Sequence, residues 1–112
     1  MAQHSYPLYL QLKQVLEDFI FSGKLLPGQE ISSIRSLAER YQVNPNTIQR
    51  ALFSLREEKL ILLNHGRLFV TSDRQMVLQC RERKARLLAS QLCTSLVSLG
   101  YGQEDILALG GL

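Results

Sequence analysis

The chain has 112 residues, of which 46% are hydrophobic, and its formal net charge of +3 comes from 13 Lys and Arg residues against 10 Asp and Glu residues. This length predicts one compact domain, or a small domain with an appendage, and so small a net charge does not by itself indicate a nucleic-acid partner. The sequence shows no basic-then-apolar leader and no long apolar run, so we expect a cytoplasmic protein with no membrane partner.

An amphipathic segment near the N-terminus predicts the first helix. Apolar residues recur there at helical spacing between Pro7 and Ser22, and Gly23 supplies a stop signal. We expect the following side chains to belong to the hydrophobic core: Tyr6, Tyr9, Leu12, Leu16, Phe19 and Ile20. Residues 26–28 have the Leu-Pro-Gly composition of a turn, so the helix should end before them.

A second, shorter helix is predicted after a brief extended piece at residues 29–31. Either Ser32 or Ser33 can cap it, because a serine hydroxyl accepts a hydrogen bond from an unpaired N–H of the first turn. The residues expected to face inward are Leu37 and Ala38. The local charge also changes here, since residues 31–56 carry four arginines against a single glutamate.

The third predicted helix carries the most informative pattern in the chain. Asn44 occupies an N-cap position and Pro45 the first helical position, where its missing N–H costs nothing. The spacing i, i+3, i+4 and i+7 predicts a buried stripe of Ile48, Ala51, Leu52 and Leu55. Hydrogen-bonding side chains suited to bases or phosphates form the opposite face, namely Asn46, Thr47, Gln49, Arg50 and Ser54. Two short helices with a tight polar turn between them therefore indicate a helix-turn-helix that binds double-stranded DNA.

Two short β-type runs follow the third helix. Residues 60–63 form an apolar run, residues 68–71 are expected to form the returning strand, and the four residues between them have turn composition. A helix-turn-helix followed by a two-stranded hairpin is a winged helix, and the tip of the hairpin is its wing. At this tip we expect His65, Gly66 and Arg67 to contact phosphate or the minor groove.

From Arg74 onward the sequence predicts one helix of about 26 residues, since no turn signal appears before Gly100. Its second half is apolar around much of its circumference, which requires cover on more than one side. A second copy of the chain is the natural partner, so we predict a homodimer with contacts from Leu88, Leu92, Leu96 and Leu99. A final helix is expected at residues 103–109. The chain thus divides into a winged-helix domain at 1–72 and a helical dimerisation region at 73–112, a mainly α fold with one small β-hairpin.

Residues suited to catalysis or metal binding are sparse in the sequence. The histidines, His4 and His65, have no nucleophile or carboxylate pair nearby, and there is no glycine-rich phosphate loop. Cys80 and Cys93 lack metal-ligand spacing, and their separation along one helix excludes an internal disulfide. We therefore expect no enzyme, no metal and no cofactor, and we expect both cysteines to be small buried hydrophobes. A disulfide between subunits, or a redox role, stays an alternative.

Five short motifs follow one another along the first two-thirds of the chain. They are PLYLQL at 7–12, SGKLLPGQ at 22–29, SxRxLA at 33–38, VNPNTIQRAL at 43–52 and HGRLFV at 65–70. Together they resemble the GntR family of bacterial transcription regulators, and the VNPNT cluster with the very short helical tail is similar to its YtrA-like subfamily. The resemblance implies an N-terminal winged helix with a small helical dimerisation region.

The resemblance also implies roles for individual residues by position. The arginine of SxRxLA is Arg35, which in relatives contacts DNA at the start of the second helix. The polar positions of the recognition helix correspond to Asn44, Asn46, Thr47, Gln49 and Arg50, although capping explains Asn44 equally well. The wing glycine corresponds to Gly66. The chain departs from the family pattern at residues 31–33, which lack a proline, and at Lys59 and Leu68, where the family has glycine.

We therefore predict a dimeric repressor that binds an inverted-repeat operator, with its recognition helices in successive major grooves about one helical turn apart. The alternative is a winged helix that docks on a protein or binds RNA. Docking would need exposed apolar anchors on the third helix, where the pattern is polar instead. Only about 40 residues follow the wing, too few to enclose a drug-sized pocket within one subunit. An unknown small-molecule effector would therefore bind between subunits, or between the tail and the winged helix.

Overall fold

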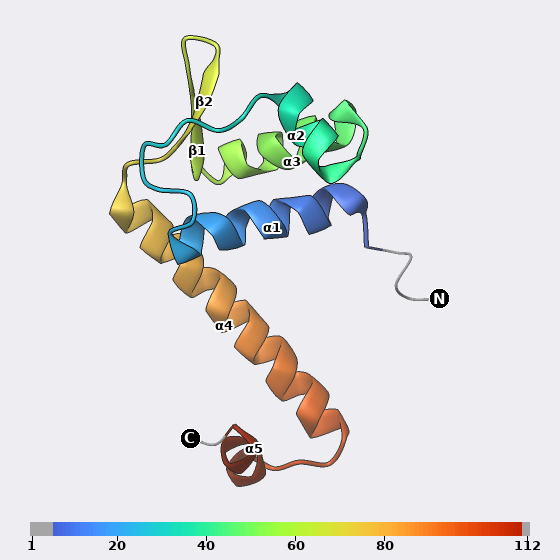
Figure 1. The fold of residues 1–112 in the computed structure, drawn as a ribbon. Helices are drawn as coiled ribbons and strands as arrows, with labels where there is room; N and C mark the ends of the chain where they lie inside the picture. Colours follow the sequence, from blue (N-terminus) through green and yellow to red (C-terminus); the bar gives the residue numbers. More distant parts are fainter. Residues whose placement is uncertain (1–5, 111–112) are drawn as a thin grey trace. The chain divides into compact units, whose positions relative to one another are not determined.

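The computed structural model of the protein describes residues 6–110 and is mainly helical with one small β-hairpin (Figure 1). Its elements in chain order are α1 (Leu8–Ser22), α2 (Ile34–Tyr41), α3 (Pro45–Glu57), β1 (Ile61–Asn64), β2 (Arg67–Val70), α4 (Arg74–Ser98) and α5 (Gln103–Leu109). The predicted fold class is confirmed. His4 and the outer ends of the two predicted domains lie outside the described residues.

The chain falls into two compact units, one ending at Gln79 and the other beginning at Cys80. The first unit holds the winged helix and the start of α4, and the second holds the rest of α4 with α5. The domain boundary that the sequence suggests, between residues 72 and 73, stays a prediction. Within residues 6–110, no helix is long and apolar enough to cross a bilayer. The same described part of the chain contains no group of His, Cys, Asp and Glu residues that could hold a metal ion.

The core of the first unit is built around α3. Both α1 and α2 pack against it, and it also contacts β1. The predicted stripe of α3 is confirmed, because its four members are buried: Ile48, Ala51, Leu52 and Leu55. The buried side chains of Leu12, Leu16 and Ile20 on α1 complete this packing, so one face of α1 belongs to the core of the winged helix.

The sequence prediction that the aromatic residues Tyr6, Tyr9 and Phe19 belong to the core is wrong. Tyr6 is 49% exposed, because it precedes the helix, and its hydroxyl donates a hydrogen bond to Gln14 Oε1 at 3.4 Å. Tyr9 and Phe19 are only half-buried. Each of these two rings carries a cation over its exposed face, Arg50 over Tyr9 and Lys24 over Phe19. An aromatic ring at the edge of a core can bury part of its surface and still offer a face to a cation.

The end of α3 contains a left-handed residue that is not glycine. Lys59 has φ = 64°, in the region that favours glycine. The Leu60 N–H donates to Leu55 O at 3.1 Å, and the Lys59 N–H donates to Arg56 O at 2.9 Å. These two bonds form a Schellman motif. The motif explains the glycine that stands at this position in the family that the sequence resembles.

We expect Lys59→Gly to raise the free energy of unfolding by up to about 1 kcal/mol, because losing the Cβ relieves the left-handed conformation. The gain is limited by the larger conformational entropy of glycine in the unfolded chain. Urea unfolding at one fixed protein concentration would measure the change. Lys59→Ala is the matched control, because it removes the same charged side chain but keeps the Cβ in the left-handed conformation. If the control gained as much stability, the left-handed backbone at Lys59 would not be the cause.

The wing is an antiparallel hairpin in which Ile61 lies opposite Val70. His65 and Gly66 form its tip, with φ values of 53° and 78°. Positive φ at both central residues is what a two-residue type I′ turn requires, and this turn matches the natural twist of the two strands. The predicted hairpin is therefore confirmed, and its tip is a tight turn of defined geometry.

The extended piece before α2 forms an isolated antiparallel β-bridge to the other edge of β2, between Glu30 and Phe69. The Val70 N–H donates to Gln29 O at 2.8 Å, and the Ile31 N–H donates to Leu68 O at 2.8 Å. These bonds join residues that are far apart in the sequence. As a result the start of α2 is held beside the wing.

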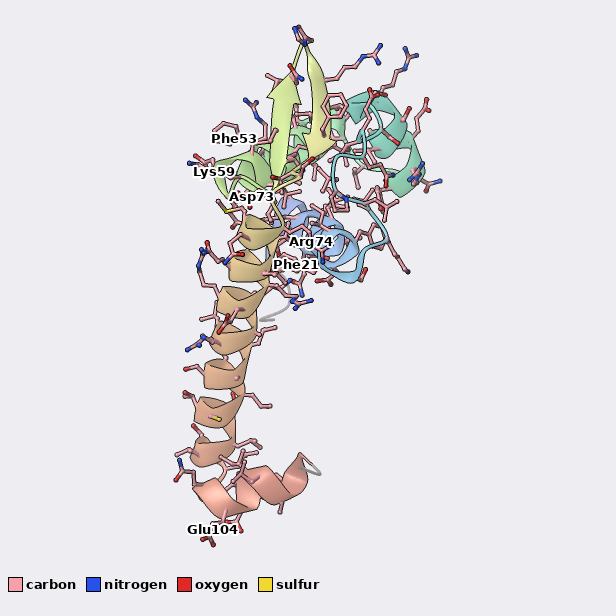
Figure 2. The ribbon with its side chains drawn as sticks, turned by 90° about the vertical axis from the view of Figure 1, so that its left-hand side faces the viewer. Phe21, Phe53, Lys59, Asp73, Arg74 and Glu104 are labelled. Atoms are coloured by element: carbon pink, nitrogen blue, oxygen red, sulfur yellow. The ribbon has the colours of Figure 1, made fainter. Side chains whose placement is uncertain are left out.

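In the second unit many apolar side chains of α4 and α5 are exposed, and Figure 2 shows side chains standing out along α4. On the predicted contact stripe the exposed fractions are 51%, 59% and 73% at Leu88, Leu92 and Leu99. Leu96 is half-buried. Cys80 is buried, but Cys93 is exposed, contrary to the prediction, because the described part of a single chain leaves this half of α4 uncovered. Neither cysteine forms a disulfide within the described residues.

Arg86 on α4 forms an ion pair within its own helix. Arg86 donates to Glu82 Oε2 from its Nη2 at 2.7 Å and from its Nε at 3.2 Å. This hydrogen bond, with the positive charge of the guanidinium, lowers the pKa of the Glu82 carboxyl. The two side chains are four residues apart and exposed to solvent. Such a pair is typical of the solvated face of a helix.

Candidate nucleic-acid interface

Two side-chain caps define where the helices of the helix-turn-helix begin. Ser33, rather than Ser32, caps α2, since its Oγ accepts a hydrogen bond from the Ser36 N–H at 3.1 Å. Asn44 caps α3, with its Oδ1 accepting from the Asn46 N–H at 2.8 Å. Caps of this kind hold the first helical turn in one geometry. The side chain of Asn44 is therefore engaged in the fold, and its contact with DNA stays a prediction.

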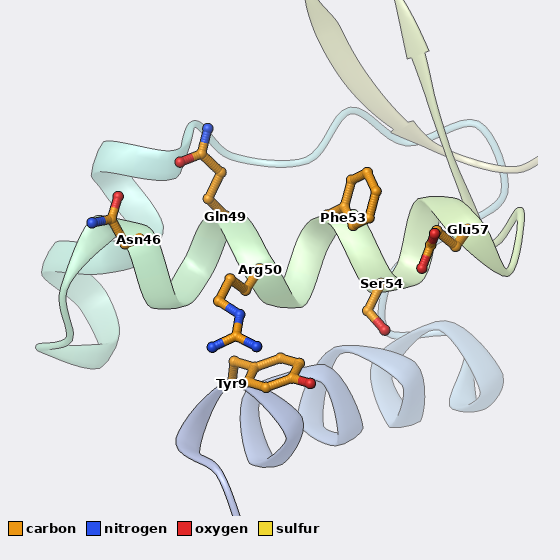
Figure 3. Close-up of a pocket in the computed structure, with 7 residues that line it drawn as sticks. All are labelled: Tyr9, Asn46, Gln49, Arg50, Phe53, Ser54 and Glu57. Carbon is orange, nitrogen blue, oxygen red and sulfur yellow. The ribbon is translucent and has the colours of Figure 1, made fainter.

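The solvent side of α3 is a mixed surface rather than one polar face. Asn46, Gln49 and Arg50 are exposed, whereas Thr47 and Ser54 are half-buried. In Figure 3, Gln49 points away from α1 and Arg50 points towards it. Neighbouring residues of a helix differ by about 100° in direction. The polar side chains are therefore divided between the flank that faces α1 and the flank that faces away.

Arg50 stacks on an aromatic ring of α1. Its guanidinium carbon lies 4.1 Å from the centroid of the Tyr9 ring (Figure 3). Contacts of this kind contribute about 0.5–1 kcal/mol at exposed sites. A surface hollow at this place is lined by Tyr9, Asn46, Gln49, Arg50, Phe53, Ser54 and Glu57. Sequence reasoning assigned Tyr9 to the core and missed the contact, because helical spacing does not show which residue of another helix lies opposite.

Phe53 is a further residue of this surface that the sequence reasoning missed. It is 57% exposed, and at about 100° per residue its direction falls between those of Gln49 and Arg50. The sequence could have revealed Phe53, because it is an aromatic residue that falls outside the predicted buried stripe of α3. An exposed aromatic ring here can contact the methyl group of thymine, and it can equally anchor a protein partner.

A second hollow brings the start of α2 to the wing. Its lining includes residues 30–35 and 66–68, so Arg35 of α2 and Arg67 of β2 lie on the same hollow. Both arginines are exposed. The start of a helix carries a partial positive charge, which adds to that of the two guanidinium groups. Such an arrangement suits an anion, and a DNA phosphate is an anion of the right size.

Arg67 has a carboxylate partner in the free protein. Its Nη1 lies 3.5 Å from Glu30 Oε1, and the two side chains are 69% and 47% exposed. Ion pairs with this exposure contribute about 0–1 kcal/mol, so a phosphate can replace the carboxylate at little cost. His65 and Gly66 at the tip are also exposed. The predicted contact residues thus form two groups, one at the first half of α3 and one around Arg35 and the wing.

Fold and surface together define the class of protein as a winged helix-turn-helix. The model of the family described as "Bacterial regulatory proteins, gntR family" matches residues 8–70, and the chain belongs to this family. It is similar to the HTH-type transcriptional repressor YtrA of Bacillus subtilis, with 29% identity over 103 residues that cover 91% of this chain and 78% of the relative. The predicted YtrA-like character is therefore confirmed.

Solved structures of relatives share the fold. A GntR family transcriptional regulator from Listeria monocytogenes matches with a TM-score of 0.90 at 30% identity, over 96% of this chain and 95% of that chain. The DNA-binding domain of AraR, solved in complex with operator ORR3, matches with a TM-score of 0.55 at 32% identity. That match covers 58% of this chain and 80% of the AraR chain. AraR thus provides an example of this fold bound to operator DNA.

Proposed function

We propose that this GntR-family protein is a transcription regulator that binds an inverted-repeat operator in double-stranded DNA as a homodimer and represses transcription. The observation that carries the proposal is the first half of α3, where Asn46, Gln49 and Arg50 point to solvent beside a capped helix start. AraR has been solved on its operator, and YtrA is named a transcriptional repressor. Such a regulator acts in the bacterial cytoplasm and needs no catalytic step.

The residues of α3 suit the major groove. Asn46 and Gln49 carry amide groups that can form paired hydrogen bonds with an adenine edge, and Thr47 can contact a base edge or a thymine methyl. Asn44 lies at the start of the helix, which is the end that enters the groove in this class of protein. These side chains would therefore supply the choice of base sequence.

The residues around the wing suit the DNA backbone. Arg35 and Arg67 can bind phosphate from the hollow that they share. The exposed tip at His65 and Gly66 can approach the neighbouring minor groove. Contacts to phosphate fix the register of a protein on the duplex, while contacts to bases select the sequence. The two groups of residues would therefore divide the tasks of affinity and specificity.

A stripe of leucines in the second unit supports the homodimer. Its members recur every three or four residues along α4 and just past its end; Leu88, Leu92 and Leu99 are exposed, and Leu96 is half-buried. Packing against the same stripe of a second copy would remove this apolar surface from water. A two-fold dimer would also place two recognition helices on two half-sites. The predicted effector would act by favouring one dimer geometry and so changing the spacing of these helices.

Phe53 favours the alternative function, in which the winged helix docks on a protein or binds RNA. The sequence argument against docking assumed that no apolar anchor is exposed on this helix, and Phe53 is one. Its nearest neighbours in direction on α3, however, are the polar Asn46, Gln49 and Glu57, whereas the core of a protein interface gathers several apolar side chains. Double-stranded DNA is therefore the better-supported partner.

Selection of binding sites from random duplex DNA with the purified protein tests the proposed function. We expect enrichment of an inverted repeat, and the logarithm of its affinity should fall linearly with the logarithm of the salt concentration. RNA of the enriched sequence serves as a competitor and should bind more weakly. If no duplex is enriched and binding does not depend on sequence, the proposed function is wrong and protein docking becomes the better explanation.

Arg35→Ala is expected to weaken binding to the selected duplex by about 10- to 150-fold, the range for losing a hydrogen bond between charged groups such as guanidinium and phosphate. The melting temperature should stay the same, because Arg35 is exposed. Arg40→Ala is the matched control, since it removes the same charge from the last turn of α2. Fluorescence anisotropy of the labelled duplex would measure both. If both variants lost the same affinity for the duplex, the effect would come from net positive charge rather than from a contact by Arg35. If Arg35→Ala lost no affinity, Arg35 would not belong to the site.

A further inference from the structure

The stack of Arg50 on Tyr9 joins α1 to the candidate DNA-binding surface. The arginine is exposed on α3, the tyrosine is half-buried on α1, and the guanidinium carbon lies 4.1 Å from the ring centroid (Figure 3). A guanidinium at this distance uses its flat face for the contact with the ring. Its N–H donors lie at the edge of the plane, where they remain able to bind phosphate oxygens.

The ring of Tyr9 is held in place by the packing of α1 on α3. One turn further along α1, Leu12 is buried in the core. Next to it, Lys13 Nζ lies 2.5 Å from Glu58 Oε2, just after the end of α3. Arginine has many rotamers and loses this freedom when it binds a ligand. Stacking on a fixed ring removes part of that freedom before DNA arrives, which lowers the cost of binding.

The flank of α3 on which Arg50 lies indicates a phosphate as its target. Arg50 points towards α1, while Gln49 points to the other flank (Figure 3). When the first turns of a helix enter the major groove, its flanks lie beside the sugar-phosphate backbone. Asn46, one turn before Arg50, lines the same hollow. The stacked guanidinium is therefore at the end of α3 that approaches DNA.

We propose that Tyr9 is a positioning residue, whose ring holds Arg50 pre-ordered so that the edge of the guanidinium binds a DNA phosphate. This inference rests on the proposed DNA-binding function. It gives α1, which otherwise serves the core, a part in setting affinity for DNA. Because a phosphate carries no base information, the effect is the same on every duplex sequence.

A double-mutant cycle of Tyr9→Leu and Arg50→Ala tests the inference, with affinities measured on the selected duplex and on a random duplex of equal length. Tyr9→Leu is expected to weaken binding to both about two- to fivefold, as the loss of an exposed cation–π contact predicts. In the Arg50→Ala background the same change should have no effect. Tyr9→Phe keeps the ring and should bind like the wild type.

The salt dependence of binding separates positioning from contact. Arg50→Ala should reduce the slope of log affinity against log salt by about one, because a phosphate contact is lost. Tyr9→Leu should leave the slope unchanged, since the charge still reaches the phosphate. Phe19→Leu is the matched control, because it removes another ring of α1 that lies under a cation, Lys24. Its affinity and slope should equal those of the wild type.

A second measurement needs no DNA. In the free protein the ring of Tyr9 should shift the NMR signals of the Arg50 side chain upfield, and Tyr9→Leu should abolish that shift. Unshifted signals in the wild type would overturn the inference even if the protein binds its duplex. The inference would also be overturned if Tyr9→Leu left the affinity for DNA unchanged, or if it lowered that affinity equally in the Arg50→Ala background. In either case the proposed function would still stand. A wild type that selects no duplex refutes the proposed function, and this inference with it.

Discussion

Leu92→Asp is expected to convert the proposed dimer into monomers. Leu92 lies on the leucine stripe of α4 and is 59% exposed in the single chain. In a two-fold interface the change removes two leucines at once, and burying one leucine contributes about 1.5–3 kcal/mol. The dissociation constant of the dimer should therefore rise at least about 100-fold, before the cost of burying two carboxylates is added. Sedimentation equilibrium over a range of protein concentrations would measure this.

The same variant should lose most of its affinity for the inverted repeat and bind it only as strongly as a single half-site. Ser90→Asp is the matched control, because Ser90 is exposed on α4 and points about 160° away from Leu92. It adds the same charge and should stay dimeric. Circular dichroism would verify that both variants keep their helices. A Leu92→Asp protein that sediments as a dimer would place the interface elsewhere.

Leu55→Ala is expected to lower the free energy of unfolding by about 2–5 kcal/mol, the range for emptying a buried leucine site. Leu55 is fully buried, with an exposed fraction of 0%. It is the last residue of the buried stripe of α3, a helix that also contacts β1, so its truncation leaves a cavity within the core. Small domains have a total stability of about 5–15 kcal/mol, so this single change removes a large share of it.

Phe53→Ala provides the matched control for that experiment. Phe53 lies on the same helix two residues earlier but is 57% exposed, so its truncation should change the stability by no more than about 0.5 kcal/mol. Urea unfolding should be compared at one protein concentration, because association shifts apparent stability. Similar losses in the two variants would mean that Phe53 is covered in solution, which would favour the docking function over DNA binding.

Local structure in this chain could be predicted from the sequence because its determinants lie within a few residues of one another. Asn44 followed by Pro45 starts α3, and the spacing of its apolar residues predicts the buried stripe. The turn at His65 and Gly66 predicts the hairpin in the same way. The family motifs add the class of protein, since they mark the same helix starts and turns. The polar residues of α3 could likewise be named in advance.

Only the tertiary structure decided which of these residues lie together. Arg35 and Arg67 line one hollow because the segment before α2 pairs with β2, and Tyr9 lies under Arg50 because α1 packs on α3. Sequence periodicity shows which face of a helix is buried, but not which residue of another element it will meet. It also placed Cys93 in a core that the single chain does not form. The sequence by itself determined the elements and their caps, because these depend on neighbours along the chain, while side-chain partners depend on packing between distant segments.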